Sequence, residues 1–145
     1  MIYNSNSVQQ TEQIGEQLAA VLKAGDVVAL DGDLGAGKTQ FTRGICRGMG
    51  LNFDDVCSPT FTIVNEYDSP KDRMPLFHFD TYRLAGSDDF IASGLDEYFY
   101  RGGVCVIEWS SLIEDILPKN TIKVTIKGNG DVREISIDMP EGRTC

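Results

Sequence analysis

The 145-residue chain contains a single histidine, and its four cysteines are widely separated. Structural zinc sites place Cys and His ligands at short, regular spacings. The sequence has no CxxC pair and no histidine close to a cysteine, so it argues against a zinc site. We expect free thiols, the usual state in a reducing cytoplasm, at Cys46, Cys57, Cys105 and Cys145.

The chain also lacks long apolar stretches. A membrane-spanning helix needs about 20 consecutive apolar residues, and no segment approaches that length. Residues 1–10 are polar and lack the apolar core of a signal peptide. We therefore expect a cytoplasmic protein that does not contact a membrane.

Basic residues are few: 13 Lys and Arg stand against 22 Asp and Glu, which gives a formal net charge of −9. Proteins that grip nucleic acid over a broad surface need clustered Lys and Arg for the phosphates. If RNA is involved, we expect another subunit to hold it. The acidic surface also suits docking on a basic protein, although a solvated surface without a partner is the commoner explanation.

What the chain does contain is a phosphate-binding pattern. Gly32 to Thr39 reads GDLGAGKT and matches GxxxxGKT at every fixed position. The apolar run 27–30 precedes it and predicts a buried parallel strand. Residues 38–49 follow it with apolar side chains at spacings of four, which predicts a helix. Strand, loop and helix in this order are the usual context of a P-loop.

Each part of this loop has a chemical reason. Glycines let backbone N–H groups turn inward and approach phosphate oxygens, and the helix N-terminus adds its dipole. Lys38 reaches the β- and γ-phosphates, and the Thr39 hydroxyl is placed to bind the Mg²⁺ of a nucleoside triphosphate. The alternative is a glycine-rich loop with a surface lysine. The predicted ATP-binding residues of this segment are Gly35, Ala36, Gly37, Lys38, Thr39 and Gln40.

The remaining segments predict a three-layer α/β fold of P-loop NTPase type, with a mainly parallel central sheet and antiparallel strands added. The length indicates one P-loop ATPase domain over residues 1–145. Periodicity and turn residues predict helices at 7–24, at 88–95, and from a cap at Ser110 to Pro118. Strands are expected at 62–67 and 76–80 as an antiparallel pair, at 104–108, and in a hairpin of 121–126 with 132–137.

Two acidic residues follow predicted strands. Hydrolysis needs a second carboxylate for the metal and a group that orients water. Glu108 ends the fully apolar strand 104–108, whereas Asp80 ends a more amphipathic one. We favour Glu108 for Mg²⁺ and Asp80 for orienting water or holding a loop. Either acid is alternatively a solvated strand end.

Thr60 and Trp109 are further candidates. Thr60 follows Pro59 in an irregular segment, where P-loop proteins often place a switch that senses the γ-phosphate. A simple turn threonine explains it equally well. Trp109 is the chain's only tryptophan and directly follows Glu108, so it is either a stacking element near the nucleotide or a core residue.

With these residues together, the chain resembles the TsaE family of small P-loop ATPases over nearly its full length. The resemblance rests on four segments in this order: GDLGAGKT at 32–39, SPTF at 58–61, HFDTYRL at 78–84 and IEW at 107–109. It implies that Lys38 and Thr39 bind triphosphate and metal and that Glu108 is the second metal ligand.

The resemblance also implies roles for residues outside the loop. Thr60 and Asp80 would act with Lys38 as switch and catalytic residues, and Trp109 would lie near the nucleotide. Residues of the first helix and of the last hairpin approach the adenine in this family, which points to Thr11 and Arg133. The chain departs from many relatives at Gln40, where they carry a second threonine. The backbone N–H of Gln40 still suits a phosphate oxygen.

A cellular role follows from the same resemblance. The family implies a bacterial cytoplasmic protein that binds a complex of TsaD and TsaB. In that complex TsaD transfers the threonylcarbamoyl group to the adenosine beside the anticodon of certain tRNAs. ATP hydrolysis, weak alone and stimulated by the partners, would reset the complex between cycles, and tRNA would be contacted only indirectly.

Other functions remain open from the residues. A small-molecule or nucleotide kinase would need a lid, which usually carries several arginines, and no Arg-rich insertion is present. A GTPase would need an NKxD element, but Lys119-Asn120 has the wrong order and no aspartate. A binding module in which ATP locks an assembly differs from the ATPase only in its rate of turnover.

Overall fold

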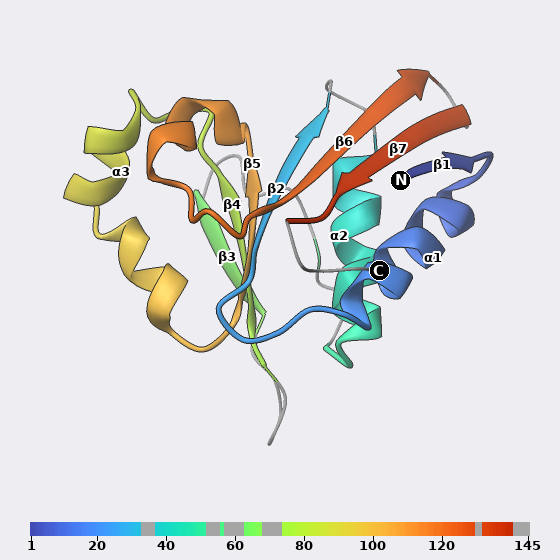
Figure 1. Ribbon diagram of the computed structural model, residues 1–145, viewed down its shortest axis with the longest axis horizontal. Coiled ribbons are helices and arrows are strands. Elements are labelled where there is room, and N and C mark those ends of the chain that lie inside the picture. Colours follow the sequence, from blue (N-terminus) through green and yellow to red (C-terminus); the bar gives the residue numbers. More distant parts are fainter. Residues whose placement is uncertain (33–36, 52–55, 57–62, 68–73, 130–131, 141–145) are drawn as a thin grey trace.

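The computed structural model describes residues 1–32, 37–51, 56, 63–67, 74–129 and 132–140 (Figure 1). The strands form one seven-stranded sheet, with strand order β1-β7-β6-β2-β5-β4-β3. The strands are β1 (Ile2–Ser5), β2 (Val27–Gly32), β3 (Val64–Tyr67), β4 (Leu76–Asp80), β5 (Val104–Glu108), β6 (Ile122–Asn129) and β7 (Val132–Asp138). The helices are α1 (Val8–Ala19), α2 (Lys38–Gly48), α3 (Ser87–Ala92) and the 3₁₀ segments η1 (Leu95–Tyr100) and η2 (Ser110–Ile116).

The centre of the sheet is parallel. Strand β2 pairs in parallel with both β5 and β6, and β5 pairs in parallel with β4. Antiparallel strands extend both sides, β3 beside β4 and then β7 and β1 beyond β6. The predicted fold class, α/β with a mainly parallel centre and added antiparallel strands, is therefore confirmed.

The two faces of the sheet carry different helices. Figure 1 shows α1 and α2 on one side of the sheet and α3 on the other. Because side chains alternate along a strand, Val104 and Val106 of β5 belong to the core beneath α1 and α2. Cys105 and Ile107 belong to the core on the opposite face, with Phe79 of β4. The continuous apolar run of β5 thus fills both cores.

Helices α1 and α2 pack closely because glycines line their contact. A Cβ atom built on Gly44 would lie 2.0 Å from the backbone oxygen of Glu12, and one built on Gly15 would lie 2.4 Å from that of Phe41. Such distances are far below van der Waals contact, so only glycine allows this approach. The apolar stripe predicted on each helix faces the sheet, with Leu18 and Ile45 almost fully buried.

The structure differs from the sequence-based prediction at several elements. The first helix ends at Ala19 rather than at residue 24. The expected helix 88–95 divides into α3 and η1, because Gly94 adopts the left-handed conformation between them with φ 75°. Strand β1 was not predicted, since its four residues depend on pairing with β7. Ser110 does not cap a helix by its side chain; its hydroxyl binds Asp31 instead, and Trp109 precedes η2.

The cysteines that the structure describes, Cys46 and Cys105, are free and buried. Burial disfavours the thiolate and raises the pKa of each thiol to about 12. Cys57 and Cys145 lie outside the described residues. Within the described residues, none of the helices has the length and apolar character that crossing a membrane requires.

We expect Gly44→Ala to destabilise the protein, because the new methyl group would meet the backbone of Glu12. Overpacking of this kind costs about 1–3 kcal/mol. Urea unfolding followed by circular dichroism measures the change. Gln13→Ala, at an exposed position of α1, is the control and should leave the free energy of unfolding nearly unchanged. An unchanged midpoint for Gly44→Ala would contradict the close helix contact.

Candidate functional site

Three parallel strands end at one edge of the sheet and bring polar residues there. The register places Glu108 of β5 between Leu30 of β2 and Asp80 of β4. Helix α2 begins at Lys38, a few residues after the end of β2. In open α/β sheets, ligands bind at the carboxyl ends of the strands. The candidate site is therefore at this edge.

Lys38 and Glu108 form the centre of the site. The Lys38 Nζ lies 3.5 Å from Glu108 Oε1, and their side chains are only 7% and 5% exposed. The same ammonium group lies 4.9 Å from the centroid of the Trp109 ring, within the range of a cation–π contact. The predicted phosphate-binding lysine, metal ligand and aromatic residue are thus brought together.

The second oxygen of Glu108 is bound by a histidine. His78 Nε2 lies 2.5 Å from Glu108 Oε2, and the imidazole is fully buried. Both carboxylate oxygens of Glu108 therefore have a partner, one on α2 and one on β4. The buried acid is thus paired with an ammonium group at one oxygen and hydrogen-bonded to an imidazole at the other, as burial of a charge requires.

Asp80 lies directly opposite Glu108 in the register, and like charges in this relation repel. The structure gives Asp80 a different partner: its Oδ1 accepts a hydrogen bond of 2.9 Å from the backbone N–H of Tyr82. This contact closes a turn just after β4. All of β4 is buried, including Asp80 at 4% exposure, so the amphipathic reading of this strand from its sequence was wrong.

The backbone at Trp109 is strained. Trp109 adopts φ 58° and ψ 38°, a left-handed conformation that a bulky residue rarely takes. Several hydrogen bonds hold it there. The Thr81 hydroxyl shares its one hydrogen between the carbonyls of Glu108 and Trp109, at 3.0 and 2.7 Å. The ring of Tyr82, an exposed residue, packs with its centroid 5.1 Å from that of the Trp109 ring.

Asp31 ties the end of β2 to the residue after Trp109. Its Oδ1 accepts from the Ser110 backbone N–H at 3.1 Å, and its Oδ2 accepts from the Ser110 hydroxyl at 2.7 Å. Because both carboxylate oxygens of Asp31 accept from Ser110, the orientation of the Asp31 side chain is fixed better than a single hydrogen bond would fix it. The strand that leads into the phosphate loop is thereby linked to the segment that carries Trp109.

Gly37 gathers a second group of predicted residues. It precedes α2 in the left-handed conformation with φ 103°. A Cβ there would lie 3.6 Å from Arg133 Nε and 3.8 Å from both Gln40 Oε1 and Thr11 Cγ2. The hydroxyl of Thr11 is already engaged, because it shares a 2.8 Å hydrogen bond with Ser5. Its methyl group faces Gly37.

The structure thus brings most of the predicted site residues to one region. Thr39 and Gln40 follow Lys38 in the first turn of α2 and are half-buried. The predicted residues Gly35, Ala36 and Thr60 lie outside the described residues. His78 and Asp31 were not among the predicted site residues. A signal for each exists in the sequence: His78 stands two residues before Asp80 on the same strand face, and Asp31 follows the apolar run 27–30.

The described residues offer one buried carboxylate and one hydroxyl to a metal at this edge of the sheet. Among residues that the structure describes, no three His, Cys, Asp or Glu side chains come together as a metal-binding group. Mg²⁺ usually takes one or two carboxylates, waters and the phosphates of its substrate. Glu108 offers one buried carboxylate at the strand edge, and the residue after Lys38 offers a hydroxyl.

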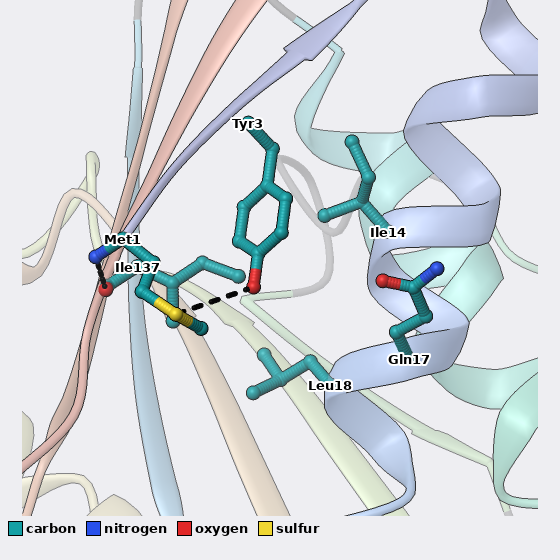
Figure 2. Close-up of a pocket in the computed structure, with 6 residues that line it drawn as sticks. All are labelled: Met1, Tyr3, Ile14, Gln17, Leu18 and Ile137. Atoms are coloured by element: carbon teal, nitrogen blue, oxygen red, sulfur yellow. Dashed lines mark hydrogen bonds between the residues drawn. The ribbon is translucent and has the colours of Figure 1, made fainter. Parts of the chain in front are cut away.

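A separate pocket lies between α1 and the strands β1 and β7 (Figure 2). Its volume is about 210 Å³ and its lining is mostly apolar; it consists of Met1, Tyr3, Ile14, Gln17, Leu18 and Ile137. The Tyr3 hydroxyl points toward the Met1 sulfur at 3.8 Å. None of the predicted site residues that the structure describes lines it.

Comparison with known proteins settles the family. The family model described as "Threonylcarbamoyl adenosine biosynthesis protein TsaE" matches residues 5–135. The chain belongs to the TsaE family. A TsaE protein of Bacillus subtilis (strain 168), named "tRNA threonylcarbamoyladenosine biosynthesis protein TsaE", is 46% identical over 129 residues, which cover 88% of this chain and 78% of that protein. The protein of the same name from Treponema pallidum (strain Nichols) is 40% identical over 134 residues, 92% of this chain and 96% of its own.

A solved structure supports the same assignment. The structure described as "Crystal structure of Bacillus subtilus YdiB" matches this TsaE family chain with a TM-score of 0.76 and 39% sequence identity. The match covers 96% of this chain and 84% of that one. The resemblance predicted from four sequence segments is therefore confirmed at the level of family and fold.

We expect Ser110→Ala to destabilise the protein by about 1 kcal/mol, because it removes one of the two hydrogen bonds to Asp31. Asp31→Ala should cost more, about 1–3 kcal/mol, since it also leaves the Ser110 N–H without its acceptor. Thermal and urea unfolding measure both changes. Ser87→Ala is the matched control, because it removes an exposed hydrogen bond to Asp115. Equal losses for Ser87→Ala and Asp31→Ala would contradict a link of this strength.

Proposed function

We propose that this protein is the ATP-binding and ATP-hydrolysing subunit of the bacterial machinery that makes threonylcarbamoyladenosine in tRNA. The observation that carries the proposal is the buried contact of Lys38 with Glu108, beside Trp109, at the strand edge where a phosphate loop enters α2. The names of the relatives supply the pathway. The site supplies the chemistry.

Lys38 and the start of α2 bind the triphosphate in this proposal. Lys38 is the first residue of α2, and the helix dipole favours negative charge at this end of the helix. The residues proposed to bind the phosphates are Gly35 to Gln40; among the described ones, Gly37 has a positive φ of 103°, which suits a loop that turns its N–H groups toward an anion. Lys38 therefore exchanges its contact with Glu108 for the β- and γ-phosphates.

Thr39 and Glu108 hold Mg²⁺ in this proposal. The ion supplies Lewis-acid stabilisation of the phosphates when it is bound. Asp80 keeps the role of orienting water or holding the turn at Tyr82, and Thr60 that of sensing the γ-phosphate.

Thr11 and Arg133 are proposed to lie against the nucleotide base. Both approach Gly37, one residue before Lys38, from α1 and β7. Arg133 offers a planar cation that stacks on aromatic rings, and the methyl group of Thr11 offers an apolar contact. Trp109 lies near the nucleotide in this proposal, since its ring centroid is 4.9 Å from the Lys38 ammonium group.

The proposed partners are the TsaB and TsaD proteins of the same organism. On this proposal ATP hydrolysis resets their complex between cycles, and tRNA is held by the partners. The net charge of −9 supports this division, because broad contact with RNA phosphates needs basic surface. The protein works in the cytoplasm, where tRNA is modified.

The first test is Mg²⁺-dependent ATP hydrolysis by the purified protein, alone and with TsaB and TsaD. We expect slow turnover alone and strong stimulation by the pair. Lys38→Ala should abolish ATP binding and turnover, whereas Lys123→Ala, at an exposed ion pair with Glu114, should change neither. Unchanged turnover on adding the partners, with no co-elution, would contradict the proposed role. Retained ATP affinity in Lys38→Ala would contradict the site.

Glu108→Gln should weaken magnesium-dependent turnover while nucleotide binding partly survives, because the amide keeps the shape of the side chain but loses the charge. Removal of one charged metal ligand is expected to lower turnover by about 100-fold or more. Turnover measured against Mg²⁺ concentration checks this. Asp80→Asn is the matched comparison. An unchanged magnesium dependence in Glu108→Gln, with a changed one in Asp80→Asn, would make Asp80 the metal ligand.

A further inference from the structure

We propose that His78 is a positioning residue that orients the carboxylate of Glu108 toward the metal and so sets the magnesium dependence of nucleotide binding. This inference rests on the proposed function. It deepens that function, because it assigns a task to the buried group that the site otherwise leaves unexplained. The interaction that carries it is the 2.5 Å contact between His78 Nε2 and Glu108 Oε2.

The strand register places His78 for this task. In the register of β4 and β5, His78 is paired with Val106. The pair of Asp80 and Glu108 follows two residues further along both strands. Residues two apart on a strand point to the same face, and diagonal neighbours on adjacent strands are within reach of long side chains. The imidazole of His78 therefore reaches the carboxylate of Glu108 along the face that carries α2 and Lys38.

The surroundings of His78 decide which nitrogen donates. Its Nδ1 has no hydrogen-bond partner within the part of the chain that the structure describes, and the residue is fully buried. A hydrogen on Nδ1 would be a buried donor without an acceptor, which is costly. The tautomer with its hydrogen on Nε2 avoids that cost and donates this hydrogen to Glu108 Oε2.

This contact matters when Lys38 changes partner. In the arrangement seen here, Lys38 holds Glu108 Oε1 and His78 holds Oε2. When Lys38 turns to a phosphate, only His78 still fixes the carboxylate, and Oε1 becomes available for Mg²⁺. Residues that orient a metal ligand in this way change metal affinity by about 10- to 100-fold when they are replaced. His78 thus preorganises the metal ligand without touching metal or nucleotide.

Two amide substitutions separate positioning from simple packing. His78→Gln places an amide N–H near the position of Nε2 and should keep the donor to Glu108. His78→Asn is one methylene shorter, so its amide N–H lies nearer the position of Nδ1 and should not reach Glu108. Each variant replaces the imidazole with one buried amide, so a purely structural histidine predicts no difference in magnesium dependence between the two variants.

The binding experiment uses Trp109 as its probe, because it is the only tryptophan and lies 4.9 Å from the Lys38 ammonium group. Fluorescence titration with ATP is repeated over a range of Mg²⁺ concentrations and without Mg²⁺. We expect the Mg²⁺ concentration that gives half of the maximal increase in ATP affinity to be about 10- to 100-fold higher in His78→Asn than in the wild type. His78→Gln should remain near the wild type, and binding without Mg²⁺ should be similar in all three proteins.

A spectroscopic measurement on the nucleotide-free protein makes the inference independent of folding losses in the variants. His78 is the only histidine, so its ring resonances are assigned without ambiguity. We expect a slowly exchanging imidazole N–H on Nε2, far downfield, that shifts in Glu108→Gln. A hydrogen on Nδ1, or no response to Glu108→Gln, would overturn the inference whether or not the His78 variants fold.

The remaining outcomes separate this inference from the proposed function. Wild-type protein that binds ATP with Mg²⁺, while a folded His78→Asn shows the same magnesium dependence, would overturn the positioning role alone. Equal losses in folded His78→Gln and His78→Asn would overturn it as well. Wild-type protein that binds no ATP at any Mg²⁺ concentration would overturn the proposed function itself.

Discussion

The buried contact between Lys38 and Glu108 is the interaction on which the rest of the site depends. Burying two charges costs several kcal/mol per ion in desolvation, and their attraction repays it only when the remaining hydrogen-bonding capacity is satisfied. Here His78 satisfies the second carboxylate oxygen, and the Trp109 ring lies beside the ammonium group. Apolar residues of similar size would fill this space at less cost. The retained charges are therefore better explained by chemistry than by stability.

This contact also constrains the fold around it. Lys38 is the first residue of α2, so α2 must begin where β5 ends. The close approach of α1 to α2, which Gly44 permits, fixes the position of α2 against the sheet. Because α1 follows β1 and β1 pairs with β7, the same packing brings Thr11 and Arg133 to Gly37. Segments from both ends of the chain thus meet at the start of one helix.

The sequence predicts the parts of this structure that depend on local patterns. Periodicity and turn residues were sufficient for α2, β5, the terminal hairpin and most of α1. The position of Glu108 at the end of an apolar strand was sufficient to place it at the sheet edge, where it lies beside Lys38. The sequence could not predict β1, whose four residues form a strand only because β7 offers a pairing edge. Nor could it predict that Ser110 binds Asp31, because that hydrogen bond joins residues 79 positions apart. The role of His78 depends likewise on the register of β4 against β5, which no local pattern encodes.

The charges at the site indicate why nucleotide and metal would bind together on the proposed function. Lys38 and Glu108 neutralise each other while they are in contact. A triphosphate that attracts Lys38 leaves Glu108 buried without its counter-charge, and breaking a buried pair in this way costs about 3–5 kcal/mol. On the proposed function, a divalent cation held by Glu108 and Thr39 would restore the missing positive charge. Triphosphate without metal would have to bear that cost, so on the proposed function the buried carboxylate would make the site selective for the metal-bound nucleotide.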